Sequence, residues 1–237
     1  MNYAIIIAGG SGKRMNSDIP KQFIQIGEKP IIVYTLEAFN RHPDIDGILV
    51  VCLPDWIDRL WAYAKKYKIE KLRWIVPGGE TGQLSCYHGL AHLENKIKPD
   101  DFVIIHDAIR PLVPSIIITD MLRVASEHGN ACSSLPVHET LIFTDNQRFG
   151  SQSLDRSIVR RVQTPQAYRF SDLFSVHQQA LAQGITNSVY ANTLFVDFGK
   201  TIHFSLGFDN NIKITTSEDL TLFKALLTMK EEDLVKK

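Results

Sequence analysis

Three glycines and two cations directly follow the first apolar run of the chain. The stretch AIIIAGGSGKRM covers residues 4–15, and its glycines are Gly9, Gly10 and Gly12. Glycines let backbone N–H groups turn toward phosphate oxygens, and Lys and Arg side chains neutralise the phosphate charge. These residue types predict a loop that holds a phosphorylated ligand at the end of a buried strand.

Two common phosphate-binding motifs fit this loop poorly. A P-loop requires G-x-x-x-x-G-K followed by Ser or Thr, but Gly12-Lys13 is followed by Arg14. Ile7 also stands where the first glycine of that motif belongs. A dinucleotide-binding fingerprint requires G-x-G-x-x-G, and Met15 occupies its third glycine position. The loop therefore belongs to another class of nucleotide site.

A carboxylate follows a second apolar run, at His106-Asp107. Mg²⁺ prefers one or two carboxylates together with phosphate oxygens, so Asp107 is a candidate to place Mg²⁺ against a triphosphate. An Asp after a strand is also commonly a simple turn residue. Arg110 follows closely, and its guanidinium fork suits the phosphate of a second substrate.

Short apolar runs alternate with segments of helical spacing through the first 136 residues. This rhythm predicts an α/β, Rossmann-like fold, with a mostly parallel sheet and helices on both faces. Ligands of such sheets bind beyond the carboxyl ends of the strands, where both the glycine loop and Asp107 lie. The predicted strands are Tyr3–Ala8, Gly47–Cys52, Leu72–Val76, Phe102–His106 and Ala131–Pro136. The predicted helices are Ile31–Phe39, Trp56–Tyr67, Gln83–Leu93 and Ile116–His128.

The pattern changes after residue 136. His138–Asp145 and Ser157–Gln163 are short and of mixed polarity, and they flank a loop over residues 146–153. They are too polar for central parallel strands, so we expect a projecting β-arm over about residues 137–160 of a single domain, 1–237. The rest of the domain is predicted to comprise a helix at Ser171–Gln183, a strand at Thr201–Ser205, the stretch Asn210–Thr215 and a helix from Ser217.

Composition narrows the class of protein. The 26 cations balance 26 anions, which argues against a nucleic-acid partner or an anionic membrane surface. No apolar run approaches the ~20 residues that cross a bilayer, and no leader segment is recognisable. The three separated cysteines, Cys52, Cys86 and Cys132, suggest reduced core thiols. We expect a cytoplasmic protein.

Six further motifs follow the opening loop, and together with it they resemble the motifs of a known family. AGGSGKRMNSDIPKQF, residues 8–23, is similar to the L-A-G-G-x-G-x-R-M…P-K-Q loop of nucleotidyltransferases. The later motifs are GGE at 78–80, HDAIRP at 106–111, HET at 138–140, LDR at 154–156, QTPQ at 163–166 and NNIKITTSEDL at 210–220. In this order, and over nearly the whole chain, they resemble the polyol-phosphate cytidylyltransferases. Those enzymes make 4-diphosphocytidyl-2-C-methylerythritol or CDP-ribitol.

The resemblance implies a reaction of CTP with a polyol phosphate, which releases pyrophosphate and uses Mg²⁺ or another divalent cation. It implies that Arg14 and Lys21 are catalytic and stabilise the charge on the reacting phosphates. The implied nucleotide-binding residues are Ala8, Gly9, Gly10, Gly12, Gly79, Glu80, Ser85, Asp107 and Ala108, with Asp107 also binding the metal. The implied acceptor-binding residues are Arg110, Thr140, Arg156, Thr164, Thr186 and Lys213. Because Arg156 lies on the arm, the resemblance also implies a homodimer with shared active sites.

Three positions depart from the family pattern and leave the acceptor open. Gly82 stands for the usual Arg, Leu84 for the usual Asp, and Asn187 for the Asp of a late Thr-Asp pair that resembles a helix start. We expect 2-C-methyl-D-erythritol 4-phosphate as the acceptor, with ribitol 5-phosphate or another pentitol phosphate as the alternative. Two alternatives of other classes are a CTP-binding protein without turnover and, disfavoured by the missing third glycine, a nicotinamide-dependent oxidoreductase.

Overall fold

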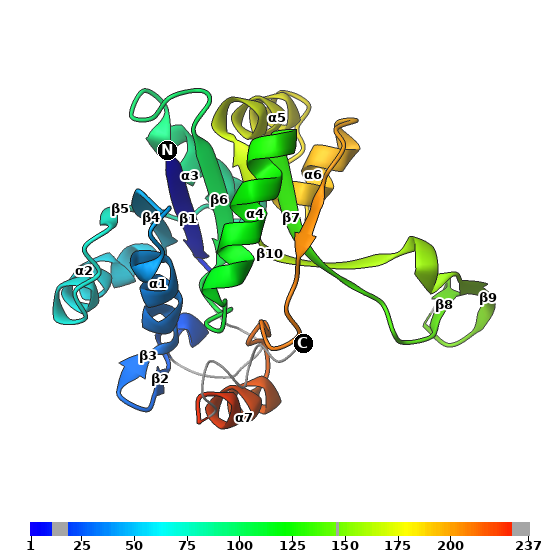
Figure 1. Ribbon diagram of the computed structural model, residues 1–237, viewed down its shortest axis with the longest axis horizontal. Coiled ribbons are helices and arrows are strands. Elements are labelled where there is room, and N and C mark those ends of the chain that lie inside the picture. The colour runs from blue at the N-terminus through cyan, green and yellow to red at the C-terminus, as the bar shows by residue number, and fades with distance from the viewer. Residues whose placement is uncertain (11–18, 146, 229–237) are drawn as a thin grey trace.

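A seven-stranded sheet forms the centre of the molecule, in a computed structural model that describes residues 1–10, 19–145 and 147–228 (Figure 1). Its strand order is β11-β7-β10-β6-β1-β4-β5, and β10 alone runs antiparallel to its neighbours β6 and β7. The strands are β1 (Asn2–Ala8), β4 (Gly47–Cys52), β5 (Leu72–Pro77), β6 (Phe102–Asp107), β7 (Asn130–Pro136), β10 (Arg160–Arg169) and β11 (Phe204–Leu206). The predicted α/β, mostly parallel architecture is confirmed.

Helices cover both faces of the sheet because neighbouring residues of a strand point to opposite sides. Ile6 packs in one core cluster beneath α1 (Ile31–Arg41), α2 (Ile57–Lys66) and α4 (Ser115–His128). Ile5 packs in the other, with residues of α3 (Gly82–Leu93), α5 (Phe170–Ala182) and α6 (Ala191–Asp197). Continuous apolar strands such as β4, whose residues are all buried, are expected when both faces are covered.

The last described helix, α7 (Ser217–Leu226), closes the lower end of the molecule in Figure 1. A capping box starts it: the Thr216 side chain accepts from Asp219 N–H, and the Asp219 carboxylate accepts from the Thr216 backbone. Phe223 is fully buried beside Ile31, Ile109 and Ile214. This cluster fixes the Asn210–Thr215 stretch against the turn after β6, where Ile214 N–H donates to the Ile109 carbonyl at 2.9 Å.

The β-arm lies within the predicted residues 137–160, and only its second strand differs from the predicted one. Its two strands are β8 (Leu141–Thr144) and β9 (Gly150–Leu154), and they project far from the sheet in Figure 1. A two-stranded sheet, β2 (Gln25–Ile26) with β3 (Lys29–Pro30), lies elsewhere. We expected Ser157–Gln163 to be the second arm strand, but it comprises part of the 3-10 helix η4 (Arg156–Ile158) and the start of β10.

The prediction failed for β10 because its polar side chains find buried partners. The Gln166 amide donates to the Gln163 carbonyl and to the Asn192 side chain, and its oxygen accepts from Tyr168. Gln163 exchanges two hydrogen bonds with the backbone of Phe208. Polar residues can therefore occupy the middle of the sheet without leaving hydrogen-bonding groups unpaired.

Two other predicted boundaries are shifted. Strand β11 begins at Phe204 rather than Thr201, because the Asn130 side chain bonds to the backbone of Thr201 and His203 in place of a strand partner. The helix that Thr186-Asn187 was expected to start begins instead at Ala191, as α6. Within the described part of the chain, no helix combines the length and apolar character needed to cross a membrane.

Gly89 allows α3 to approach the sheet closely. A Cβ at this position would lie 2.9 Å from Ile5 Cγ2 and 3.1 Å from Val51 Cγ2, whereas a Cβ at Gly82 in the same helix would meet nothing within 4 Å. Both Gly→Ala changes favour the helical backbone, but only one strains the packing. We predict that Gly89→Ala is less stable than Gly82→Ala by about 1–2 kcal/mol in urea unfolding. Equal stability of the two variants would show that α3 can shift freely on the sheet.

Candidate functional site

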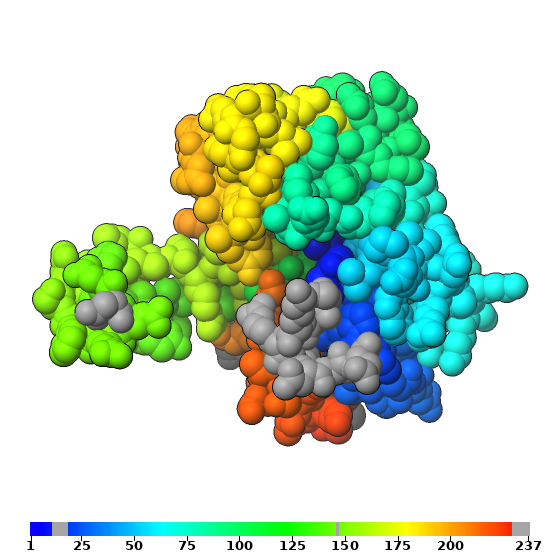
Figure 2. Space-filling view, turned by 180° about the vertical axis from the view of Figure 1, so that it is seen from behind, coloured from blue at the N-terminus to red at the C-terminus, as the bar shows by residue number. Residues whose placement is uncertain are grey.

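A cavity of about 450 Å³ opens at the carboxyl ends of β1 and β6. The strand order reverses between these strands, because β4 and β5 extend the sheet on the far side of β1. Such a switch point is where open α/β sheets bind ligands. Figure 2 shows the dark-blue end of β1 at the bottom of a hollow bordered by α3 and α5.

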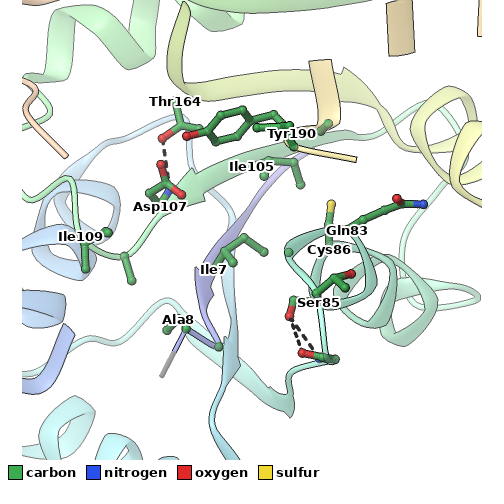
Figure 3. Close-up of a pocket in the computed structure, with 18 of the residues that line it drawn as sticks. Ile7, Ala8, Gln83, Ser85, Cys86, Ile105, Asp107, Ile109, Thr164 and Tyr190 are labelled. Atoms are coloured by element: carbon green, nitrogen blue, oxygen red, sulfur yellow. Dashed lines mark hydrogen bonds between the residues drawn. The ribbon is translucent and has the colours of Figure 1, made fainter. Parts of the chain in front are cut away.

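Asp107, at the end of β6, carries the negative charge of the site and is largely shielded from solvent. Its Oδ2 lies 3.1 Å from Lys213 Nζ and 3.2 Å from Arg110 Nε. Burial alone would raise the pKa of this carboxyl group, but the two cations outweigh burial and hold the pKa below its usual range. Asp107 is therefore an ionised carboxylate, and its own backbone N–H donates to Thr164 Oγ1 (Figure 3).

Lys213 reaches the cavity from the Asn210–Thr215 stretch. Burial alone would lower the pKa of the Lys213 ammonium group. Asp107 and the Tyr190 hydroxyl raise it by more than burial lowers it, so the net shift is upward and the ammonium stays charged. Its Nζ donates to the Tyr190 oxygen at 3.0 Å and lies 4.9 Å from the centre of that ring. One ammonium group thus connects β6 with the segment before α6.

A turn between β5 and α3 forms the opposite wall. Gly79 N–H donates to Ser85 Oγ, which in turn donates to the Gly79 carbonyl (Figure 3). A Cβ at Gly79 would lie 2.5 Å from Leu84 Cβ, so the turn requires glycine at this position. Thr81 caps α3 by accepting from Leu84 N–H. The helix N-terminus and backbone groups therefore face the cavity, as recognition of a nucleotide by backbone groups requires.

Gln22 holds the end of β1 in place. Its amide nitrogen donates to the carbonyls of Ala8 and Gly10, at 2.6 and 3.0 Å. Lys21 precedes it in the 3-10 helix η2 (Lys21–Phe23), is 9% exposed and lines the cavity. Because Gln22 is tied to the strand end, the neighbouring Lys21 is fixed beside the opening loop.

The structure brings most of the sequence-predicted residues to one cavity. Those that line it are Ala8, Gly9, Gly10, Lys21, Gly79, Glu80, Ser85, Asp107, Ala108, Thr164 and Lys213. Gly12 and Arg14 lie outside the described residues. Chain segments that are far apart in sequence thus meet at the carboxyl edge of the sheet.

Four other predicted acceptor residues do not line the cavity. Arg110 lies behind Asp107, where its Nη1 donates to the Asn211 carbonyl at 2.7 Å. Thr186 lies beside the cavity wall, where its carbonyl accepts from Thr81 Oγ1. Thr140 and Arg156 belong to the arm, and Arg156 Nη1 donates to the His138 carbonyl there.

Sequence reasoning missed several residues of this cavity, among them Gln22, Gln83, His177 and Tyr190. The sequence signal for Gln22 was its place as the last residue of the P-K-Q motif. Gln83 directly follows Gly82, one of the departures from the family pattern. Tyr190 and His177 gave no signal, because neither belongs to a motif, and only the packing of α5 and α6 brings them to the cavity.

His177 is 1% exposed, and neither ring nitrogen has a hydrogen-bond partner among the described residues. Burial lowers its pKa to about 4 from an ordinary 6.5. His106, also fully buried, has its pKa lowered to about 4 as well. In the folded protein both side chains are therefore neutral, and protonation of either favours the unfolded state.

This linkage predicts a loss of stability in mild acid. The unfolded chain binds more protons than the folded chain between the two pKa values, so stability falls as pH falls from about 6.5 toward 4. Each histidine contributes at most about 1.4 kcal/mol per pH unit within that window. We predict a shallower decline for His177→Phe than for the wild type in urea unfolding between pH 7 and 5. Identical pH dependence in both proteins would mean that His177 is not held neutral.

A family model described as 2-C-methyl-D-erythritol 4-phosphate cytidylyltransferase matches residues 2–229. A ribitol-5-phosphate cytidylyltransferase of Lacticaseibacillus paracasei is 45% identical over 230 residues, which are 96% of this chain and 98% of that protein. A 2-C-methyl-D-erythritol 4-phosphate cytidylyltransferase of Clostridium botulinum is 38% identical over 227 residues, which are 95% of this chain and 97% of that protein.

The fold also matches solved structures. A 4-diphosphocytidyl-2C-methyl-D-erythritol synthase structure from Anaerococcus prevotii aligns with a TM-score of 0.82 and 26% identity, over 96% of each chain. The likeness therefore extends over the sheet and the helices that form the cavity.

Proposed function

Because this chain belongs to the 2-C-methyl-D-erythritol 4-phosphate cytidylyltransferase family, we propose that it transfers CMP from CTP to ribitol 5-phosphate and releases pyrophosphate. That it is a cytidylyltransferase follows from the family. The acceptor is the proposed part, and it is favoured by the Lacticaseibacillus relative, which is the more similar of the two relatives described above. 2-C-methyl-D-erythritol 4-phosphate is the second candidate, since the family model and the Clostridium relative carry its name.

One observation carries the proposal: a backbone-lined turn and a charged cluster face the same cavity. Gly79 and Ser85 form a wall suited to a pyrimidine nucleotide, and Lys213 beside Asp107 supplies a cation for an acceptor phosphate. Both reactants can then be held side by side. Direct attack of the acceptor phosphate on the α-phosphorus needs positioning and charge stabilisation rather than a covalent enzyme intermediate.

In this reaction Lys21 stabilises the charge on the α-phosphoryl group and the leaving pyrophosphate, together with Arg14, which lies outside the described residues. Arg110 acts from behind, because its contact with Asp107 helps to keep the carboxylate ionised. Thr164 and Lys213 gather the acceptor.

The donor set of the cavity fits a divalent cation held mainly by the nucleotide. Within the described ranges, no three His, Cys, Asp or Glu side chains are grouped as metal ligands. Asp107 supplies one carboxylate, whose Oδ1 makes no hydrogen bond to the described residues, and Mg²⁺ accepts one carboxylate with phosphate oxygens. When bound, Mg²⁺ would neutralise triphosphate charge beside Asp107.

The arm supports a homodimer with shared active sites. Ile142, Phe143 and Ile158 of the arm are 53–77% exposed, and exposed apolar surface on a projecting segment is typical of protein–protein contacts. Thr140 and Arg156 lie on the same projecting segment, away from the cavity of their own chain. A second copy would allow these two side chains to act at its partner's acceptor.

The identity of the acceptor can be tested directly. With CTP and Mg²⁺, pyrophosphate release is expected with ribitol 5-phosphate, and not with ATP in place of CTP or without an acceptor. 2-C-methyl-D-erythritol 4-phosphate is assayed in parallel. Pyrophosphate release with 2-C-methyl-D-erythritol 4-phosphate alone would identify that compound as the acceptor in place of ribitol 5-phosphate. No release with either compound, together with a CTP-induced rise in melting temperature, would overturn the proposed acceptor.

Variants of the cavity and of the arm test whether the active site is shared between two subunits. Lys21→Ala is expected to lower kcat by about 10²–10³-fold, since it removes a cation from the reacting phosphates, whereas Arg156→Ala should mainly raise the acceptor KM.

If the arm acts at the partner's cavity, a dimer that combines one Lys21→Ala subunit with one Arg156→Ala subunit contains one unaltered site. Co-expressed variants should then be more active than either alone. A mixture that only averages the two activities would exclude sharing.

A further inference from the structure

The Tyr190 hydroxyl has a hydrogen-bond donor to spare. An ammonium group only donates, so in the 3.0 Å bond with Lys213 Nζ the phenol oxygen is the acceptor. The phenol O–H remains available, and it has no acceptor among the described residues. Tyr190 lines the cavity, and Figure 3 shows its ring extending toward Asp107 and Thr164. The spare donor therefore belongs to the site, next to a cation that suits a phosphate.

The segment that carries Tyr190 is fixed to the nucleotide side of the cavity. The Gln83 amide donates to the Ile185 carbonyl at 2.6 Å, and its oxygen accepts from Ser188 N–H at 2.7 Å. Thr81 Oγ1, two residues earlier at the N-cap of α3, donates to the Thr186 carbonyl. Three hydrogen bonds thus hold this segment against the first turn of α3. The tyrosine is oriented before any acceptor arrives, which lowers the entropic cost of using it.

Capping of α6 does not account for the hydroxyl. Tyr190 occupies the N-cap position of α6, but its side chain makes no capping hydrogen bond. A phenylalanine could make the same ring contact with Lys213 and occupy the same space. The feature specific to tyrosine is the hydroxyl, which contacts Lys213 in the wall of the cavity.

We propose that Tyr190 is an acceptor-binding residue, whose hydroxyl donates to a phosphate oxygen of the phosphomonoester that Lys213 also contacts. This inference rests on the proposed function and adds a residue to its acceptor side. Lys213 would supply the charge, and Tyr190 a directional donor that orients the phosphate for attack. Two adjacent donors, carried by different segments of the chain, would then define the orientation of the acceptor.

Tyr190→Phe tests this assignment, with Tyr34→Phe as the matched control. Tyr34 also loses a hydrogen-bonded hydroxyl, the one that donates to the Ile26 carbonyl, and it lies outside the cavity. We expect Tyr190→Phe to raise the acceptor KM at least about tenfold, the loss typical of a hydrogen bond to a charged group, and to leave the CTP KM unchanged. Tyr34→Phe should change neither constant. An unchanged acceptor KM in Tyr190→Phe would overturn the inference.

A binding measurement separates this inference from the proposed function. Calorimetry with ribitol 5-phosphate and with inorganic phosphate needs no turnover, and the Tyr190→Phe protein is expected to bind both more weakly than the wild type. Normal turnover by both proteins with equal phosphate binding would overturn the role of Tyr190 alone. A wild-type protein that releases no pyrophosphate with any polyol phosphate would overturn the proposed function, and weaker phosphate binding by Tyr190→Phe would still support the contact.

Discussion

The negative charge of Asp107, largely shielded from solvent, is the constraint on which the site depends. A carboxylate taken out of water must be paired, and here Lys213 and Arg110 pair with it from two directions. Each cation belongs to a different connection: Arg110 to the turn after β6, and Lys213 to the stretch before α7. Satisfying one charge therefore fixes three segments, and it leaves an ammonium group facing the cavity.

A polar layer inside the sheet supports this arrangement. Gln163 and Gln166 of β10 satisfy their amides within the protein, and Asn211 donates to the Thr164 carbonyl at 2.8 Å. Because the Asn211 carbonyl also accepts from Arg110, the antiparallel strand and the ion pair are one connected network. A connected polar network of this kind fixes geometry more strictly than apolar packing, which suits a site that must orient two phosphorylated reactants.

The departures from the family pattern lie on the wall formed by α3 and its partner segment. Gly82 leaves open space where the family usually has Arg, and Leu84 packs where a Cβ on Gly79 would collide. Asn187 belongs to the segment that Gln83 and Thr81 hold. The cation cluster around Asp107 is unaffected by these changes. The departures and the cation cluster therefore lie in different parts of the site.

The sequence alone determined the parallel sheet and the charged and glycine residues that form much of the cavity. Apolar runs at strand spacing can be buried only between helices, and the glycine turns, Lys21, Asp107 and Lys213 stand in recognisable motifs. Only the tertiary structure decided that polar β10 lies inside the sheet, that Arg110 supports Asp107 from behind, and that Tyr190 reaches Lys213. Asp107 is close to Arg110 in the chain, but Arg110 is also held by the distant Asn211, and the other two features likewise depend on distant partners. A polar side chain is tolerated in the interior only where folding brings a complementary group to it.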